Sequence, residues 1–395
     1  MENPILHIDM NNFYASVECL YAPEYRNVPM AVAGDKKNRH GIILAKNMLA
    51  KKAGVKTAET IWQAQKKCPN LALISPHFER YQHYSQKAKE IYSNYTDRVE
   101  SFGLDECWLD VGGSGRLFGD SLQIAEEIRE RVKAELGLTV SIGVSFTKTF
   151  AKLGSDYKKP DAVTVFSKEN YRQLVWPQAT ENLLFVGANT KKILNQYGIK
   201  NIGDIACSDR VWMKKKLGKM GESLWLSANG EDSSVVERID AEEDVKTIGN
   251  STTLPRDISK EQDIQTALLS LAESVSSRLR KHERRCGEVQ ITVRSKDFEE
   301  FQRQCSVSPS ICDSQSIYET AWKLYKKENK RWQVRLLGIR AGKLTEIEEE
   351  QISLFGETEK HKKRERLEMT MDKVRERFGD DSVHRAVLKP EDDEG

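Results

Sequence analysis

A pair of adjacent acidic residues inside an apolar stretch restricts the fold of this chain more than any other feature of its sequence. Asp105 and Glu106 lie between two strand-like runs, Val99–Phe102 and Cys107–Val111, within ESFGLDECWLDV. The runs are only a few residues apart, which predicts a β-hairpin with both acids at or just after its turn. Half-buried carboxylates side by side are costly unless a cation meets them. The pair therefore predicts a sheet and a cation-binding site on it.

A third carboxylate, Asp9, ends the first predicted strand, Ile5–Asp9. Adjacent side chains of a regular strand point to opposite faces, so Asp105 and Glu106 can share a site only where a turn bends the chain. If the first strand lies beside the hairpin, all three carboxylates meet at one edge of the sheet. Mg²⁺ prefers a few carboxylates together with phosphate oxygens and water, and two such ions about 3.5–4 Å apart serve phosphoryl transfer. An exposed turn with solvated acids is the alternative.

The alternation of strands and helices predicts an α+β fold with helices on one face of the sheet. Residues 121–136, for example, carry apolar side chains at a spacing of four, which predicts a helix with one apolar face. After residue 166 short helical pieces with glycine turns predict a small all-helical module. Strands return at residue 245, and the tail from residue 343 is strongly charged, with helical spacing again from Leu367 to Phe378.

Composition excludes some classes of protein. The 62 basic and 60 acidic residues nearly cancel, so their placement carries more information than the net charge of +2. The seven cysteines are scattered without a C-x-x-C pair, which argues against a zinc site or a disulfide framework and fits a reducing cytosol. We find no apolar run of the roughly 18 residues that a membrane span needs, and expect an intracellular protein.

Four motifs resemble those of the Y-family (translesion) DNA polymerases, most closely the bacterial DNA polymerase IV group. In chain order they are HIDMNNFYASVE (7–18), SFGLDECWLDV (101–111), SIGVSFTKTFAKLGSDYKKPDAVTVF (141–166) and IGNSTT (248–253). The resemblance covers nearly the whole chain. It implies a right-hand polymerase with a ferredoxin-like palm, small fingers, a helical thumb and an additional α+β little-finger domain that binds DNA. The implied domains are palm 1–20 and 77–166, fingers 21–76, thumb 167–236, linker 237–244, little finger 245–342 and a tail 343–395 with a clamp-binding motif.

The resemblance also assigns roles to single residues. Asp9 and Asp105 would be the main ligands of two Mg²⁺ ions, Glu106 would complete this catalytic site, and the backbone carbonyl of Met10 would help. Tyr14 would be the steric gate, whose ring lies beneath the sugar of the incoming nucleotide and excludes a 2′-hydroxyl. Further nucleotide contacts would come from Phe13, Lys51 and Lys159, where Lys159 holds the triphosphate. Without the motif, core packing would be the favoured explanation for Phe13 and Tyr14.

The chain departs from the family pattern at several positions. Asn11 replaces a second acidic residue that is not an essential ligand. Ala45 and Met48 stand where a Thr and a Tyr usually contact the nucleotide, and they cannot donate those hydrogen bonds. Lys51 keeps the charge of the usual Arg but loses its bidentate fork. Thr147 replaces a common Asn. These changes put nucleotide affinity in question more than the type of reaction.

DNA contacts should go to phosphates, because such an enzyme holds duplex without reading its sequence. The basic run Arg278–Arg285 is an ambiguous candidate, since cations are favoured at a helix end in any case. Better candidates are a glycine of the thumb and polar residues on the strands of the last domain: Gly187, Thr247, Ser251, Thr252, Arg294, Lys296, Arg335 and Arg340.

The tail contains QISLF, which fits the Q-x-x-[LM]-F peptide by which bacterial polymerases bind the sliding β-clamp. Gln351, Leu354 and Phe355 would make this contact. Apolar side chains in a charged tail would otherwise be exposed. Packing of the pentapeptide on its own domain is the alternative.

Together these features predict a monomeric, template-directed DNA polymerase of low fidelity without proofreading, acting in the bacterial cytoplasm at the nucleoid. The primer 3′-hydroxyl of primer-template DNA would attack the α-phosphate of a dNTP. Two other classes stay open from sequence. A non-catalytic, clamp-bound DNA-binding protein is raised by Ala45 and Met48, and a nucleotidyl cyclase could share the paired carboxylates.

Overall fold

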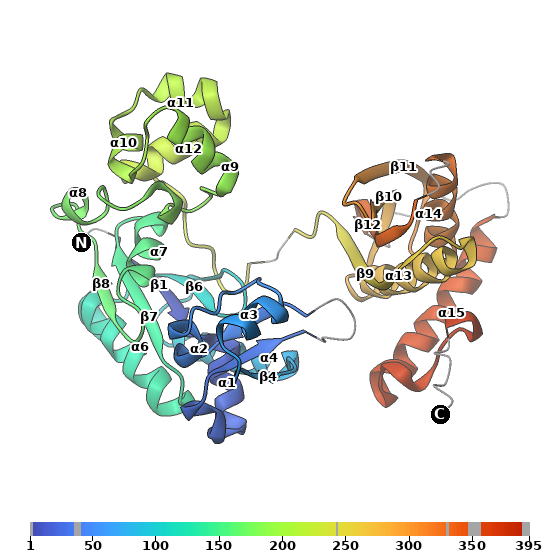
Figure 1. Cartoon of the computed structure of the whole chain (residues 1–395), viewed down its shortest axis with the longest axis horizontal. Helices are drawn as coiled ribbons and strands as arrows, with labels where there is room; N and C mark the ends of the chain where they lie inside the picture. Colours follow the sequence, from blue (N-terminus) through green and yellow to red (C-terminus); the bar gives the residue numbers. More distant parts are fainter. Residues whose placement is uncertain (1–2, 35–40, 242–243, 329–331, 347–356, 389–395) are drawn as a thin grey trace. The chain divides into compact units, whose positions relative to one another are not determined.

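The computed structural model describes residues 3–34, 41–241, 244–328, 332–346 and 357–388 (Figure 1). These residues form two compact units, divided in the sequence at residues 242–243. Each unit has its own sheet and its own hydrophobic core. In this part of the chain every helix is too short or too polar to cross a membrane.

The main sheet of the first unit places the carboxylate-bearing segments next to one another. Its strand order is β5-β6-β1-β7-β8, with β1 antiparallel to both β6 and β7. The predicted hairpin is present as the antiparallel pair of β5 and β6. The bounds are β1 Ile5–Met10, β5 Val99–Ser101, β6 Glu106–Asp110, β7 Val140–Ser145 and β8 Val163–Val165.

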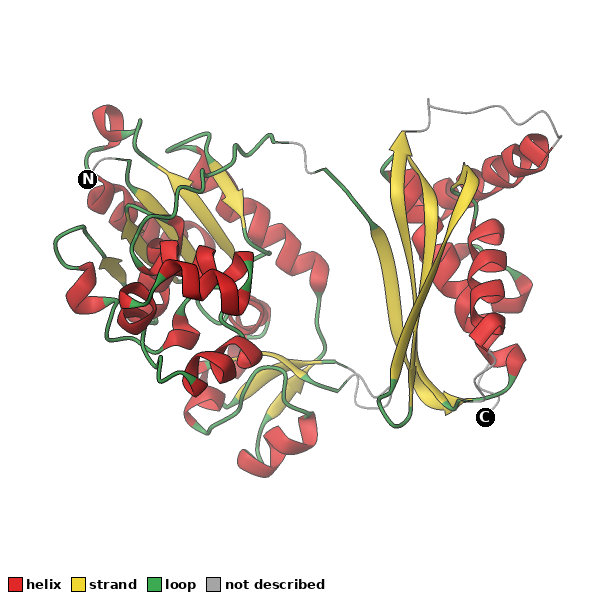
Figure 2. Ribbon diagram, turned by 90° about the horizontal axis from the view of Figure 1, so that it is seen from above, coloured by secondary structure: helices red, strands yellow, loops and turns green. Residues whose placement is uncertain are grey.

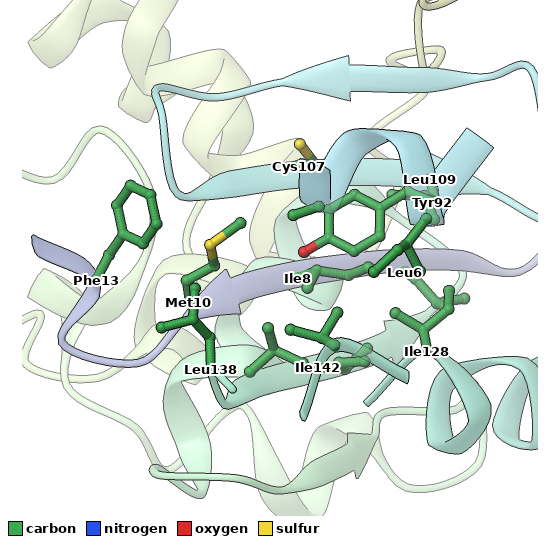
Figure 3. Packing of buried hydrophobic residues seen from close by; sticks show 14 of the residues in the cluster. Leu6, Ile8, Met10, Phe13, Tyr92, Cys107, Leu109, Ile128, Leu138 and Ile142 are labelled. Carbon is green, nitrogen blue, oxygen red and sulfur yellow. The ribbon is translucent and has the colours of Figure 1, made fainter. Parts of the chain in front are cut away.

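One face of this sheet packs on helices α4 (Phe78–Ser93) and α6 (Ser121–Leu136). Alternate residues of β1, namely Leu6, Ile8 and Met10, point into that core, as Figure 3 shows. The period of two along the strand then sends the residues in between to the opposite face. Asp9 therefore lies on the face away from this core.

The opposite face is covered by α7 (Lys148–Tyr157), so the expectation of helices on one face only is wrong. The helix can lie on the sheet because Gly143 of β7 has no side chain: a Cβ there would come within 1.8 Å of the Ala151 carbonyl oxygen. Gly154 of the helix faces the same spot, since a Cβ added there would come within 2.9 Å of the Gly143 Cα. Two glycines in contact thus bring the polar residues of α7 down to the acidic end of β1.

Two smaller modules complete the first unit. A three-stranded sheet of order β3-β2-β4 carries two short helices and a separate small core. A group of helices around a third core follows β8. The bounds of the elements of the first unit not given above are α1 Phe13–Tyr21, η1 Pro23–Asn27, β2 Met30–Ala33, β3 Ile43–Lys46, α2 Met48–Lys52, α3 Ile61–Lys67, β4 Ala72–Ile74, α5 Gly115–Phe118, α8 Tyr171–Leu174, η2 Thr180–Asn182, α9 Ala188–Gln196, α10 Ile202–Cys207, α11 Arg210–Leu217 and α12 Lys219–Ala228.

The second unit is a four-stranded antiparallel sheet of order β11-β10-β12-β9. Figure 2 shows its long strands with the helices on one side. The other side is left as a polar face. The bounds are β9 Ile248–Ile258, α13 Glu261–Lys281, β10 Arg284–Ser295, β11 Glu300–Ile311, α14 Ser314–Glu328, β12 Val334–Glu346, α15 Glu357–Phe378, η3 Asp380–Ser382 and η4 Ala386–Leu388.

The last helix, α15, is attached to this unit by a buried ionic cluster around Glu368, whose residue is 4% exposed. Its carboxylate oxygens lie 2.6 Å from Arg280 Nη1 and 2.7 Å from Arg385 Nη2. The backbone amide of Ser314 donates a further hydrogen bond of 3.0 Å. Because every partner is also polar and largely removed from water, loss of the carboxylate leaves buried charge unpaired.

We predict that Glu368→Ala destabilises the second unit by about 3–5 kcal/mol, the usual cost of breaking a buried ion pair from one side. Calorimetric melting of the full chain would show this as a lower transition temperature for one unit. Glu376→Ala, an exposed site on the same helix, is the matched control and should change stability by less than about 0.5 kcal/mol. Superimposable melts for Glu368→Ala and the parent chain would contradict the assignment.

Candidate active site

Two of the three predicted carboxylates lie opposite each other across neighbouring strands. Asp9 of β1 pairs in register with Glu106, the first residue of β6. Directly opposite residues share one face of an antiparallel sheet, with Cβ atoms about 4.5–5.5 Å apart. Asp105 lies in the turn before β6, and its carbonyl accepts a 3.0 Å hydrogen bond from the Met10 amide. The structure therefore brings all three residues to one end of the sheet.

Burial acts differently on the three acids. Desolvation raises the pKa of Asp9 from 3.8 to about 7, against the pull of nearby Lys159, and Glu106 raises it further. Burial, and next the charge of Glu106, also raise the pKa of Asp105. Burial would raise the pKa of Glu106 as well, but contacts with His7 and Lys152 outweigh it and hold that pKa at about 2. The positive charge near Asp9 and Asp105 therefore does not fully offset their burial.

Lysines of α7 and the segment after it supply the cations that are present. Lys159 Nζ lies 2.7 Å from Asp9 Oδ2 and 2.6 Å from Asp156 Oδ1. Lys152 Nζ lies 2.5 Å from Glu106 Oε2, and His7 Nε2 lies 3.3 Å from the same oxygen. The family resemblance predicts that Lys159 holds the triphosphate of the nucleotide. In the structure its ammonium group binds Asp9.

Sequence reasoning missed two of these residues, His7 and Lys152. Signals for both were available. His7 precedes Asp9 by two residues and therefore shares its face of β1. Lys152 follows Lys148 by four residues, which places both on one face of α7. Only the motif residue Lys159 drew attention, because nothing in the sequence shows that α7 lies over the acids.

The donor chemistry fits a hard divalent cation, although the acids do not form a ready ligand cluster. Among the residues that the structure describes, no three acidic, histidine or cysteine side chains are close enough together to hold a metal ion. Asp9 and Glu106 each bind a lysine instead. Carboxylate and carbonyl oxygens are the ligands that Mg²⁺ prefers. The raised pKa values of Asp9 and Asp105 show where added positive charge would stabilise the site.

Asn11 acts as a connector between β7 and the segment after Lys159. Its side-chain amide donates a 2.9 Å hydrogen bond to Ser141 Oγ, and its carbonyl accepts a 2.8 Å bond from the Asp161 amide. Thr147, another departure from the family pattern, accepts from the Phe150 amide and caps α7. Both replacements therefore have structural partners.

Three of the residues predicted to contact the nucleotide lie on two helices, Phe13 and Tyr14 on α1 and Lys51 on α2. Phe13 is buried in the core, whereas Tyr14 is partly exposed at the start of α1. Burial, and then the charge of Asp105, raise the pKa of Tyr14. Lys51 is exposed at the end of α2. Lys46, which sequence reasoning missed, has its pKa lowered by burial and by the charge of Lys51.

An open groove of about 850 Å³ runs along α7 on the side of the helical module. It is lined by Lys152 and Asp156 of α7 and by residues 181–187 of the module. Gly187, a predicted DNA contact, begins α9 and borders this groove. As a glycine it has no side chain that could cap the helix, so the first amides of α9 remain available to an anion.

The predicted DNA contacts of the second unit lie on or beside its sheet. Strand register puts Ser251 opposite Gly338, and Arg340 opposite Gln290, on the polar face. Thr252 pairs with buried Leu337 and so belongs to the helix-covered side, where its backbone remains accessible on this edge strand.

The other residues predicted to contact DNA differ in their contacts within the protein. Arg294 binds Glu300 at 2.6 Å, and Arg335 lies over the ring of Phe298. Thr247 and Lys296 are exposed.

Two arginines of the basic run Arg278–Arg285 stabilise the structure. Arg280 binds Glu368 of α15, and Arg285 binds Glu365 at 2.7 Å. Both arginine side chains are only 9% exposed, so the phosphate role is not supported for these two residues. The predicted clamp contacts Gln351, Leu354 and Phe355 lie outside the described residues.

Comparisons with known families cover most of the chain. Residues 8–156 match the impB/mucB/samB family, and residues 245–354 match the impB/mucB/samB family C-terminal domain. The first match includes Asp9, Asp105 and Glu106 of the candidate site, and the second includes the IGNSTT segment at residues 248–253.

Individual relatives agree with the family matches. The chain is 48% identical to a DNA polymerase IV of Acetivibrio thermocellus over 390 residues, which is 98% of both chains. It is 37% identical to a DNA polymerase IV of Clostridium kluyveri, again over 98% of both. A solved Y-family DNA polymerase chimera has a similar fold, with a TM-score of 0.76 and 20% identity over 87% of this chain and 99% of the other.

We predict that Asp9→Asn raises the melting temperature of the first unit near pH 8. The folded-state pKa of about 7 lies above the unfolded value, so stability from Asp9 is present below about pH 4 and is lost as pH rises toward 7. Removing the charge should restore on the order of 1 kcal/mol at pH 8 and almost nothing at pH 4. Thermal melts at both pH values would measure this.

When Mg²⁺ is added to the same thermal melts, the gain in melting temperature should be larger for the parent chain than for Asp9→Asn. A cation that binds the folded state stabilises it by mass action, so Mg²⁺ should raise the melting temperature of the parent chain more than that of Asp9→Asn. Asp97→Asn, an exposed acid of the same unit, is the control. An equal Mg²⁺ response in the parent chain and Asp9→Asn would count against cation binding at Asp9.

Proposed function

Since the chain belongs to the impB/mucB/samB family and is a Y-family DNA polymerase of the translesion class, we propose that Asp9, Asp105 and Glu106 bind its catalytic cations. The supporting observation is their placement at one end of a sheet, two of them in cross-strand register. Burial has raised the pKa of Asp9 and Asp105, as expected for acids that work with an added cation. The Met10 carbonyl would be a further ligand.

The reaction joins a dNTP to the primer 3′-hydroxyl on primer-template DNA and releases pyrophosphate. Two bound Mg²⁺ ions would supply activation of the hydroxyl and neutralisation of charge on the phosphates. Asp9 would help to hold a cation, and Lys159, whose ammonium group binds Asp9 in this structure, would pair with the triphosphate. Lys152 and His7 hold Glu106 ionised and oriented throughout.

Nucleotide selection is assigned to the start of α1 and to the small sheet. Tyr14 lies beneath the sugar as the steric gate, with Phe13 buried behind it. Lys51, with Lys46 beside it, contributes positive charge towards the triphosphate. Ala45 and Met48 add no hydrogen bonds there, which favours weak nucleotide affinity and, with small fingers, low fidelity.

DNA would be held through its phosphates. The free amides of α9 behind Gly187 offer one anion site, next to the groove along α7. In the second unit the polar face of the sheet offers Ser251, Arg294 and Arg340, with Thr247, Lys296 and Arg335 nearby and the Thr252 backbone on the edge. Gly338 adds no side chain between the longer ones on this face.

We also propose that the chain acts as a monomer at the nucleoid of a bacterial cytoplasm, tethered through QISLF to the sliding β-clamp. The tether compensates for a modest affinity for DNA, which is expected because the basic and acidic residues of the chain nearly balance. Family membership and the intact acids leave the two alternatives, a non-catalytic DNA-binding protein and a nucleotidyl cyclase, without support.

We predict that Asp105→Asn lowers primer extension by at least about a thousandfold, as expected when charge stabilisation of the transition state is removed. Single-turnover extension with Mg²⁺ on undamaged and abasic templates measures this. Asp97→Asn should extend like the parent chain. Equal extension by Asp105→Asn and the parent chain would remove the metal-site assignment.

A separate prediction concerns the clamp. The double variant Leu354→Ala/Phe355→Ala should bind immobilised β-clamp at least about tenfold more weakly, because it loses two apolar anchors. Surface plasmon resonance measures the affinity, and Ile352→Ala serves as the comparison within the same peptide, since the motif leaves that position free. Unchanged clamp affinity in the double variant would place the contact elsewhere.

A further inference from the structure

We propose that Glu18 and Tyr81 hold the ring of Tyr14 in place and thereby set how strongly the enzyme rejects ribonucleotides. This inference rests on the proposed function, in which Tyr14 is the steric gate. A gate of this kind works by collision with a 2′-hydroxyl. The collision discriminates only if the ring cannot turn aside, so whatever immobilises the ring determines the selectivity.

Tyr81 supports one face of the gate. The two rings lie parallel, with 4.2 Å between centroids and 9° between planes. Phe78 approaches the Tyr14 ring edge-on at 6.0 Å, and Phe13 approaches Tyr81 at 6.3 Å. Tyr81 itself is fully buried in α4. The ring of Tyr14 is therefore confined by an aromatic group whose central member cannot move without disturbing the core.

A buried carboxylate fixes Tyr81 in turn. The phenol of Tyr81 donates a 2.6 Å hydrogen bond to Glu18 Oε1 and accepts one of 3.1 Å from the His77 amide. Glu18 is only 2% exposed. It also accepts hydrogen bonds from His77 Nδ1 at 2.9 Å and from Arg80 Nη1 at 3.0 Å. Burial, and next the bond to Glu18, raise the pKa of Tyr81, so its hydroxyl stays protonated and remains a donor.

The chain places gate and support on the same two helices. Glu18 follows Tyr14 by four residues, one turn further along α1. His77, Arg80 and Tyr81 come from the start of α4. An apolar residue at position 18 would fill this core without the cost of burying a charge. A carboxylate with three donors instead defines a single orientation of Tyr81, and hence of the gate ring that stacks on it.

The test compares insertion of a dNTP and of the matching ribonucleotide, as the ratio of the two kcat/KM values. The variants are Tyr81→Phe, which removes only the hydroxyl, Tyr81→Leu, which also removes the stacked ring, and Glu18→Gln. We expect the ratio to fall about tenfold in Tyr81→Phe and Glu18→Gln and further in Tyr81→Leu. The change should come from faster ribonucleotide insertion, while kcat/KM for the dNTP stays within about threefold. Tyr84→Phe, another tyrosine of α4, is the control and should keep the parent ratio.

Tyr14→Ala separates this inference from the gate assignment. If Tyr14→Ala raises ribonucleotide insertion while the Tyr81 and Glu18 variants keep the parent ratio, the supporting role is overturned and the gate stands. If Tyr14→Ala leaves the ratio unchanged, the gate assignment itself fails. An equal loss for both nucleotides in Tyr81→Phe, which preserves side-chain volume and core packing, would show a structural role only and would also overturn the inference.

Discussion

The rest of this structure depends on one constraint: carboxylates are buried with too little positive charge nearby to offset their loss of water. Asp9 and Glu106 are opposite each other on neighbouring strands, and Asp105 lies in the adjoining turn. Two lysines satisfy only part of this charge, and the pKa of Asp9 remains near 7. An acidic site that is electrostatically incomplete by itself costs stability, and cations bound there would return that free energy. Under the proposed function, the residues that cost stability are also those that bind the cations.

The backbone around the acids places the remaining groups of the site. Close packing of Gly143 on Gly154 lets α7 lie over β7, which carries Lys152 to Glu106. Asn11 connects β7 to the segment after Lys159. Strand β1 leads within a few residues into α1, which carries Tyr14 in its first turn. Pairing of the distant strands β1 and β6 thus brings the acids together, the short connection from β1 to α1 places Tyr14, and the packing of α7 places Lys152.

Local sequence patterns predicted much of this arrangement, and long-range contacts decided the rest. A short apolar run predicted β1 and turn spacing predicted the β5–β6 hairpin, because those signals lie within a few residues. The same patterns could not show that α7 covers the second face of the sheet, since this depends on two glycines meeting in space. The roles of Tyr81 and Glu18 and the use of Arg280 by α15 depend on partners 63 and 88 residues away, respectively.

The ionisation of Asp9 tests the central electrostatic claim most directly. Its carboxyl carbon can be followed by ¹³C NMR between pH 4 and pH 9, with the signal assigned by its absence in Asp9→Asn. We predict a midpoint near pH 7 in the absence of divalent cations and a midpoint several tenths of a unit or more lower in saturating Mg²⁺. A midpoint near that of an ordinary aspartate, or one that Mg²⁺ leaves unchanged, would contradict an acid desolvated to receive a metal ion.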